Sequence, residues 1–187
     1  YCESDDGLSF SITDELMLVP TDEPHLTYEE AIYDPRLTEI DGTYYCTDAS
    51  ENRFGCQVGL SRSRDLKTWE KMELIAEPDN RNIVLFPEKI DVPGRGKLYC
   101  RLDRPFTGPF GQQEGGMWVS YSPDLTFWGM HRNIMTSRRF HWDRGKIGPG
   151  APPIRTDAGW LIIYHGTTPY CNGLVYRLGL ALLDLED

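Results

Sequence analysis

The sequence repeats a short motif every 59 residues, and this spacing constrains the fold more than any other feature. The three copies are residues 4–10, 63–69 and 122–128, each with a serine, an aspartate and a closing aromatic residue, and a shorter fourth copy lies at 182–185. A period of this length, filled with short strand patterns, is typical of the blades of a β-propeller. We expect the aspartate to cap a tight turn and the aromatic residue to pack between neighbouring blades.

Each repeat also carries two strand patterns joined by a turn. A strand pattern containing proline comes first and an apolar strand follows, in segments that begin at Asp34, Phe86 and Pro152. Asp41-Gly42 and the Asp-Ala-Gly sequence at 157–159 are typical turns between antiparallel strands. The run WLIIY at 160–164 is predicted to be a buried strand. Helical periodicity is nearly absent, so the sequence predicts an all-β fold.

Three periods account for most of the 187 residues. A closed propeller needs roughly four to eight blades. We therefore expect residues 1–187 to hold about three blades of a single propeller domain that is incomplete at one or both ends.

Composition excludes several classes of function. The chain carries 19 Lys and Arg against 29 Asp and Glu, a net charge of −10, which argues against nucleic acid or an anionic membrane as a partner. No apolar run is long enough to span a membrane, and the first residues lack the regions of a signal peptide. Five cysteines without CxxC spacing argue for reduced thiols rather than disulfides or zinc ligands. We therefore expect a cytoplasmic protein without a bound metal.

The candidate chemistry lies where inner strands line the central funnel of a propeller. These positions hold one carboxylate, Asp34, which precedes Pro35 and is expected to be extended for that reason. They also hold potential cations and two tyrosines: Arg81, Arg104, Lys146, His165, Tyr33 and Tyr176, with Asn82 beside Arg81. Two arginines, a lysine and a histidine that converge on one axis would bind a phosphate through charge-assisted hydrogen bonds.

Each candidate also has an interpretation without a ligand. Arg81 and Arg104 could be surface charges, His165 could be a core histidine, and Asp34 could cap a turn. Lys146 opens a loop rich in glycine and proline, and His165 follows the buried strand at 160–164. The shared positions of these residues in the repeat favour a common site.

Seven motifs lie in one order along the chain: YDPR at 33–36, NIVLFPEKI at 82–90, DRP at 103–105, SYSPDLTFWG at 120–129, KIGPGAPPI at 146–154, GWLIIYHG at 159–166 and YRLGLALLDLED at 176–187. Together they resemble the mannoside phosphorylases of glycoside hydrolase family 130. The resemblance runs from about residue 4 to the last residue. It implies a five-bladed β-propeller, of which this chain would hold about three blades.

The resemblance also implies a reaction. The family transfers a mannosyl group from a β-mannoside to inorganic phosphate with inversion, which gives α-mannose 1-phosphate and a shortened sugar. Asp34 would be the general acid and would pass its proton to the glycosidic oxygen through the mannosyl 3-hydroxyl. Phosphate would be bound by Arg81, Asn82, Arg104, Lys146 and His165, and sugar would be contacted by Tyr33 and Tyr176. Inorganic phosphate is the co-substrate and a β-mannoside oligosaccharide the partner, no cofactor or metal is implied, and the protein could assemble as a homo-oligomer.

A single catalytic carboxylate suits phosphorolysis. An inverting hydrolase needs an acid and a second carboxylate that activates water, whereas phosphate arrives as an anion and needs only a cationic site that orients it. Two alternatives stay open. One is an inverting β-mannosidase with Glu88 as the candidate base, and the other is a non-catalytic sugar-binding propeller without a phosphate site.

Two residues depart from the family pattern. Pro149 stands where a small residue is expected, and Asp103 stands where His or Ser is more usual. An aspartate next to a phosphate ligand would weaken binding unless its side chain points away. Arg104 is preferred to Arg101 as the phosphate ligand because it adjoins Pro105.

Overall fold

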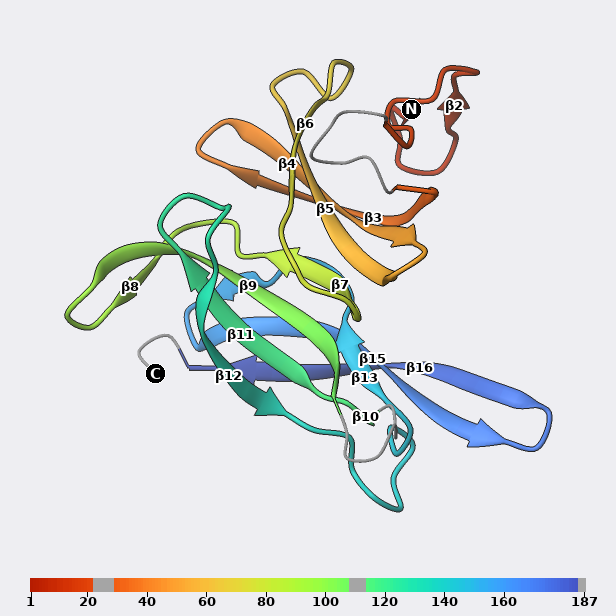
Figure 1. Ribbon diagram of the computed structural model, residues 1–187, viewed down its shortest axis with the longest axis vertical. Helices are drawn as coiled ribbons and strands as arrows, with labels where there is room; N and C mark the ends of the chain where they lie inside the picture. The colour runs from red at the N-terminus through yellow and green to blue at the C-terminus, as the bar shows by residue number, and fades with distance from the viewer. Residues whose placement is uncertain (22–28, 108–113, 185–187) are drawn as a thin grey trace.

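The computed structural model describes residues 1–21, 29–107 and 114–184, and the regular structure in these ranges consists of β-strands alone. The prediction of an all-β fold is confirmed. The strands form three larger antiparallel sheets and one small pair (Figure 1). The small pair joins β1 (Cys2–Glu3) to β2 (Ser11–Ile12).

The first large sheet is a meander in which each strand pairs with the next one along the chain. Its strands are β3 (Ala31–Ile40), β4 (Thr43–Asn52), β5 (Gly55–Ser63) and β6 (Glu70–Leu74). Asp41 and Gly42 form the predicted turn between β3 and β4, with φ of 51° and 73°. Glycine adopts positive φ without strain and aspartate tolerates it, which explains this pair of residues.

The second sheet is built around the long strand β9. Its strands are β7 (Asn80–Leu85), β8 (Ile90–Val92), β9 (Gly96–Thr107), β10 (Glu114–Gly115), β11 (Met117–Ser122) and β12 (Gly129–Met135). β7 and β11 pair with β9, β12 pairs with β11, and the short β8 and β10 add to β9. The strand predicted from Phe86 forms only in part, since residues 86–89 lie outside the strands. Pro87 has no N–H to donate to a ladder, which explains the interruption.

In the third sheet, two short strands share one edge of β15 and β16 pairs with the other edge. The strands are β13 (Ile147–Pro149), β14 (Ile154–Thr156), β15 (Gly159–Tyr170) and β16 (Gly173–Leu183). The predicted buried strand at 160–164 lies within β15, and the predicted turn at 157–159 precedes it.

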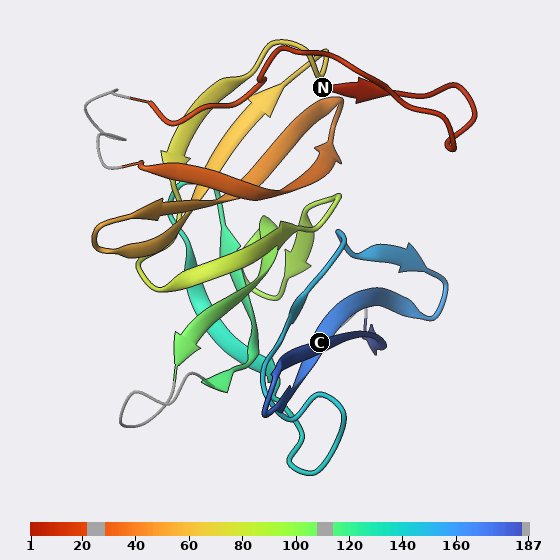
Figure 2. The same ribbon diagram turned by 90° about the vertical axis from the view of Figure 1, so that its right-hand side faces the viewer.

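The three sheets follow one another face to face, as blades of a propeller do (Figures 1 and 2). The inner strand β7 contacts both β3 and β13. Buried apolar side chains fill the two spaces between sheets, and because successive residues of a strand point to opposite faces, Ile83 and Leu85 join one cluster while Val84 joins the other. The first residues of β3 and β7, and the segment leading into β13, therefore meet near one point.

The repeated motif forms the predicted turn. In the third copy, Asp124 Oδ1 accepts two backbone N–H groups at 3.0 and 2.9 Å. Asp65 and Asp6 do the same in the other two copies. Trp128 packs against the cluster between the first and second sheets, as predicted. The prediction is wrong for the first copy, whose closing residue Phe10 is 57% exposed. The fourth copy extends to Leu185, which lies outside the described residues.

One face of β16 is apolar and exposed. The side chains of Tyr176, Leu178, Leu180 and Leu182 alternate along the strand and are 55, 74, 69 and 53% exposed. A contiguous apolar row of this kind is unusual on a free protein surface.

The cysteines form no disulfide with one another, and Cys2 and Cys171 are exposed thiols. In the part of the chain that the structure describes, no helix is long and apolar enough to cross a membrane.

Candidate active site

The catalytic candidate Asp34 is held by groups from two sheets. Its Oδ2 accepts a hydrogen bond from Asn82 Nδ2 at 2.9 Å and forms an ion pair with Arg36 Nη1 at 3.0 Å. Asp34 comes from β3 and Asn82 from β7, so the contact joins the first sheet to the second. The Asp34 side chain is 43% exposed. With Oδ2 engaged on both sides, Oδ1 is the oxygen that can face a substrate.

The backbone at Asp34 and Asn82 explains how these side chains meet. Both residues have positive φ, 59° and 62°, and each lies at a register shift in its ladder. Such bulges re-aim side chains next to active sites, and Asp and Asn tolerate the left-handed region better than most residues. The expectation that Pro35 keeps Asp34 extended is therefore wrong, because the bulge imposes a different backbone shape.

Arg36 is a site residue that the sequence reasoning did not assign. Its Nε donates to the backbone carbonyl of Gly150 at 3.0 Å, and its Nη1 donates to the backbone oxygen of Asp34 at 2.9 Å. Its side chain is only 12% exposed. Arg36 thus connects the first sheet to the loop of the third sheet. Its place in the YDPR motif was the available signal.

The predicted sugar contact Tyr33 lies beside the cationic residues. Its hydroxyl donates to Glu51 Oε2 at 2.7 Å and accepts from Arg81 Nη1 at 3.2 Å. Burial, followed by the hydrogen bond to Glu51, raises the pKa of Tyr33 well above its ordinary value. Tyr33 therefore stays a neutral phenol, and its orientation is fixed between the Glu51 carboxylate and the Arg81 guanidinium.

Two arginines, the half-buried Arg81 and the buried Arg104, form the centre of the predicted phosphate site. Arg81 on β7 pairs across the ladder with Arg104 on β9, and their guanidinium carbons lie 5.0 and 4.6 Å from the centre of the Phe106 ring. The Nε atoms of both arginines are buried and, within the described part of the chain, have no hydrogen-bond partner. Burial, and next the charge of Arg81, lowers the pKa of Arg104 to about 10, so it stays protonated at neutral pH. Phe106 is a second residue that the sequence reasoning missed.

The third sheet contributes the remaining predicted residues. Lys146 precedes β13, and its Nζ lies 5.8 Å from the centre of the Tyr176 ring. The rings of His165 and Tyr176 are also 5.8 Å apart. Burial, followed by the positive charges of Arg104, Arg36 and Lys146, lowers the pKa of His165 to about 4. His165 therefore lies next to these three cationic side chains and is itself neutral at physiological pH.

Two glycines make room for Arg104. A Cβ atom on Gly148 would lie 2.9 Å from His165 Cε1 and 3.2 Å from Arg104 Cδ. A Cβ atom on Gly115 would lie 2.9 Å from Arg104 Cδ and 3.2 Å from Lys146 Cβ. Gly148, the first glycine of KIGPG, is therefore needed for close packing at the site, rather than for a turn.

The structure separates Arg104 from Arg101. Arg101 Nε pairs with Asp103 Oδ2 at 3.1 Å, and Arg101 Nη1 donates to the backbone oxygen of Ile75 at 2.7 Å. Asp103 and Arg104 are neighbours on β9, so their side chains leave opposite faces of the strand. The unusual aspartate thus points away from the predicted phosphate site, and Arg104 is the arginine on the side of Arg81 and His165.

The carboxylate considered as a base for a hydrolase lies elsewhere. Glu88 follows the end of β7, whereas Arg81 and Asn82 lie at its beginning. Its Oε1 pairs with Arg155 Nη1. Glu88 therefore has a structural partner and does not join Asp34.

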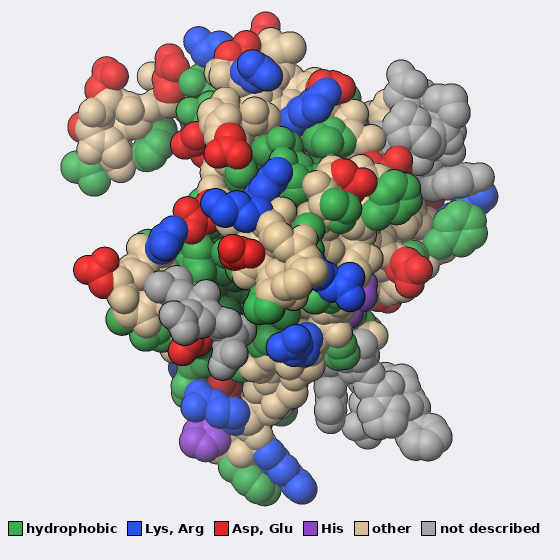
Figure 3. All heavy atoms as spheres, turned by 90° about the vertical axis from the view of Figure 1, so that its left-hand side faces the viewer, with side chains coloured by type: hydrophobic (Ala, Val, Ile, Leu, Met, Phe, Trp, Pro, Cys, Tyr) green, Lys and Arg blue, Asp and Glu red, His purple; other side chains and the backbone are tan. Residues whose placement is uncertain are grey.

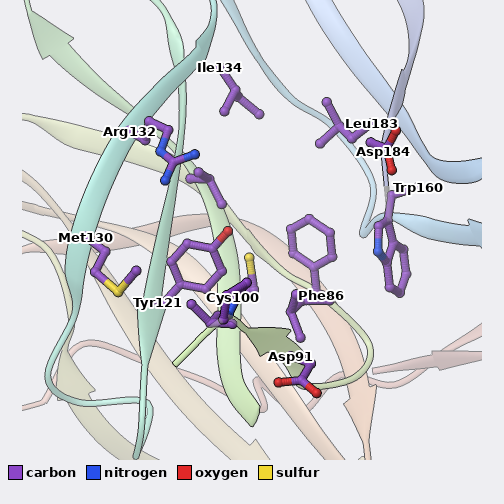
Figure 4. Close-up of a pocket in the computed structure, with 14 residues that line it drawn as sticks. Phe86, Asp91, Cys100, Tyr121, Met130, Arg132, Ile134, Trp160, Leu183 and Asp184 are labelled. Carbon is purple, nitrogen blue, oxygen red and sulfur yellow. The ribbon is translucent and has the colours of Figure 1, made fainter. Parts of the chain in front are cut away.

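The basic residues of the site are a local feature of a chain whose net charge is −10. On the face shown in Figure 3, acidic and basic side chains are interspersed. A separate pocket of about 270 Å³ between the second and third sheets contains none of the predicted site residues; Tyr121 and Arg132 point into it beside Phe86 and Trp160 (Figure 4). Among the described residues, no group of three or more His, Cys, Asp or Glu side chains could hold a metal ion. The arrangement is a cationic cradle beside one carboxylate, which suits an oxyanion.

Comparison with known proteins gives a family for this arrangement. The family model of glycoside hydrolase family 130, described as beta-1,4-mannooligosaccharide phosphorylase, matches residues 1–187. The chain belongs to this family. The resemblance seen in the sequence motifs is thereby confirmed.

Characterised members of the family are similar along most of the chain. A beta-1,2-mannobiose phosphorylase from Listeria innocua is 36% identical over 98% of this chain and 48% of its own length. A beta-1,4-mannooligosaccharide phosphorylase from Ruminococcus albus is 37% identical over 83% of this chain and 44% of its own length. The chain thus spans about half the length of these relatives.

Solved structures of the family share the fold. The Listeria innocua beta-1,2-mannobiose phosphorylase, in complex with beta-1,2-mannobiose, superposes with a TM-score of 0.85 at 34% identity, covering 100% of this chain and 49% of that one. A further structure, from work on family 130 glycoside hydrolases that target beta-1,2 mannosidic linkages in Candida mannan, has a TM-score of 0.80 at 22% identity and covers 58% of its chain. At that identity the second likeness shows the fold alone.

Proposed function

We propose that the protein carrying this chain catalyses inverting phosphorolysis of a β-mannoside, with α-mannose 1-phosphate and a shortened sugar as products. The observation that carries the proposal is the pair of arginines Arg81 and Arg104, whose Nε atoms are buried and have no partner among the described residues. A buried cationic donor without a partner is rare, because leaving it unpaired is unfavourable. A phosphate ion would supply the missing acceptors.

The roles of the other residues follow from this placement. Lys146 and His165 would complete the phosphate site from the third sheet. Phosphate is an anionic nucleophile and needs orientation rather than a base, so one carboxylate suffices. Asp34 Oδ1 would donate the proton that the leaving sugar needs, while Asn82 holds Oδ2. Asn82 would thus orient the acid, in addition to the phosphate contact expected from the sequence.

The sugar would lie between the two tyrosines. Tyr33 and Tyr176 are 40 and 55% exposed and flank Asp34 and His165 from the first and third sheets. Relatives named for β-1,2 and for β-1,4 linkages both match the chain. The proposal is accordingly for a β-mannoside, with inorganic phosphate as co-substrate and no cofactor or metal.

We also propose that the three sheets are blades of a five-bladed propeller. The apolar exposed face of β16 supports this, since a neighbouring blade would bury it. The greater length of the relatives also supports it. Part of the sugar site would then come from blades outside these 187 residues.

The test is the phosphate dependence of sugar release by the natural full-length protein, with β-1,2- and β-1,4-linked mannobiose as substrates. The proposal expects release only with phosphate and mannose 1-phosphate as product. Asp34→Asn should lower turnover by about 10²–10⁴-fold while phosphate binding, measured by calorimetry, persists. Equal release without phosphate, with free mannose as product, would overturn the proposal in favour of a hydrolase.

A further inference from the structure

A second, larger pocket lies between the first and second sheets. Its volume is about 620 Å³, within the range of small-molecule sites. The end of β6 and the segment 75–79 form one wall, and side chains of β9, β11 and β12 form the other. Asp103 lines this pocket, whereas its neighbour Arg104 faces the phosphate site. The pocket therefore lies behind the active site, across β9.

Two buried oxygens in the lining of this pocket lack hydrogen bonds. Asp103 and Asn80 are 1 and 7% exposed. Oδ1 of each side chain has no partner among the residues that the structure describes. Both atoms are acceptors, so a ligand that satisfies them must present donors, such as hydroxyl groups.

The charges around these oxygens favour a neutral ligand. Asp103 is paired with the equally buried Arg101, so the two buried charges offset each other. Glu77 and Asp79 also line the pocket, but both are exposed, where solvent and salt screen their charges. A free cation would gain little at such a floor. Trp118 Nε1, which also lines the pocket and is buried without a partner among the described residues, is a donor. The pocket therefore requires acceptors as well as donors, and a hydroxyl group supplies both.

The apolar part of the lining is rich in rings. Trp118, Trp128 and Phe106 contribute aromatic surface, and Pro78 and Pro105 add aliphatic rings. A pyranose ring has one apolar face of C–H groups and an edge of hydroxyl groups. Aromatic walls around a few polar groups recognise a ligand of this kind. We propose that this pocket binds a neutral saccharide unit at a site separate from the active site.

The pocket in Figure 4 differs from this site in its volume and in its hydrogen bonding. That pocket holds about 270 Å³, less than half the volume. None of the buried unpaired side-chain atoms in the described residues belongs to its lining. Its polar groups therefore do not require a ligand, whereas Asp103 and Asn80 do.

The second saccharide site would adjoin the phosphate site. Phe106 lines the pocket and also carries the guanidinium groups of Arg81 and Arg104 on its ring. Asn80 directly precedes Arg81 on β7. An oligosaccharide bound there would be held close to the reacting centre. The choice of a mannoside as the probe rests on the proposed function. The geometry of the pocket is independent of that function.

The experiment is calorimetric titration of the natural full-length protein with β-1,4-mannotriose, without phosphate and in an Asp34→Asn background so that the probe is not consumed. Two binding events are expected. Thr126→Trp would fill the pocket from its half-buried position in the third repeat turn. It should weaken one event at least tenfold and leave the other. The matched control is Lys67→Trp, the equivalent exposed position one repeat earlier, which should leave both events unchanged.

Two further measurements keep the test valid if Thr126→Trp fails to fold. Trp118→Leu should weaken the same event, and the indole N–H signal of Trp118 should shift in the NMR spectrum of the Asp34→Asn protein when mannotriose is added. A single binding event, two events unaffected by Thr126→Trp, or an unmoved Trp118 signal would overturn the proposal. Because binding is measured without phosphate, loss of phosphate dependence would overturn the proposed function and leave this site standing.

Discussion

Arg101 and Arg104 lie three positions apart on β9, and each is 2% exposed, yet their surroundings differ. Arg101 donates to Asp103, Ser120 and the backbone of Ile75, and its guanidinium lies 4.3 Å from the centre of the Trp128 ring. Among the residues that the structure describes, Arg104 forms no ion pair with a carboxylate, and its Nε has no hydrogen-bond partner. The guanidinium of Arg101 is bound by groups of the protein itself. The guanidinium of Arg104 keeps a donor that a ligand could use.

The electrostatic environments differ in the same sense. Burial is the main cause that lowers the pKa of both arginines to about 10. The next contribution for Arg101 is the charge of Asp103, which opposes the shift. For Arg104 it is the charge of Arg81, which adds to it. Like charges are thus brought together at the active site, an arrangement that a bound anion would stabilise.

The largest expected effect tests the internal arginine. Arg101→Ala would leave Asp103 buried without its cation and would remove the hydrogen bond to Ile75. We expect the free energy of unfolding to fall by about 3–5 kcal/mol, measured by urea denaturation. A loss below about 1 kcal/mol, the range of an exposed ion pair, would contradict the structural role of Arg101.

The matching change at the other arginine should have the opposite pattern. Arg104→Ala removes a charge that the fold disfavours, so the free energy of unfolding should stay the same or rise. Phosphate affinity, measured by calorimetry, should fall by about 10²–10³-fold. Arg104→Lys should recover only part of it, because lysine cannot form the bidentate contact of a guanidinium. Destabilisation of Arg104→Ala as large as that of Arg101→Ala would erase the distinction between the two.

A smaller effect is expected from crowding the site. Gly148→Ala adds a Cβ atom against His165 and Arg104. A displacement of a few tenths of an ångström should weaken phosphate binding by roughly tenfold, about 1.4 kcal/mol, because the cradle depends on position. The matched control is Gly129→Ala, since a Cβ atom there meets nothing within 4 Å. Equal phosphate affinity for the two variants would show that the close packing has no role.

The smallest effect concerns the histidine beside Arg104. NMR titration of phosphate-free protein should show His165 protonating only near pH 4, below its ordinary value of 6.5. Between these pH values the unfolded chain takes up a proton that the folded protein does not, so stability falls as the pH drops from about 6.5 towards 4. Arg104→Ala should raise the pKa of His165, since it removes one of the neighbouring charges. An unchanged titration would place Arg104 farther from the ring.

Much of the fold could be predicted from the sequence because local chemistry determines it. The caps at Asp65 and Asp124 and the turn at Asp41-Gly42 follow from hydrogen bonding and backbone preference within a few residues. Regular spacing of these motifs then predicts successive sheets. The interruption at Pro87 was missed because an apolar pattern outweighed the missing N–H group.

The proximity of the candidate residues could be predicted, whereas their geometry could not. Their equivalent positions in the repeat predict that Asp34, Arg81, Arg104, Lys146 and His165 lie close together, and in the structure they do. Their roles in binding and catalysis stay predictions. The conformation of Asp34 was not predictable, because a bulge in β3 overrides the preference imposed by Pro35. Arg36 and Phe106 were missed for another reason. Their roles depend on which face of a strand packs against another sheet. A bulge moves the following side chains to the opposite face, and the sequence pattern does not reveal where a bulge occurs.

The bond from Arg36 to Gly150 spans 114 positions of the chain, which has a consequence for how activity is acquired. Hairpins within each sheet close over short loops and form early, whereas contacts between distant segments are slow to form. Asp34 receives its final orientation only when the first and third sheets have met. During refolding, strand content should therefore return before the ability to protonate a substrate. Recovery of proton donation by Asp34 would then report that the first and third sheets have packed together.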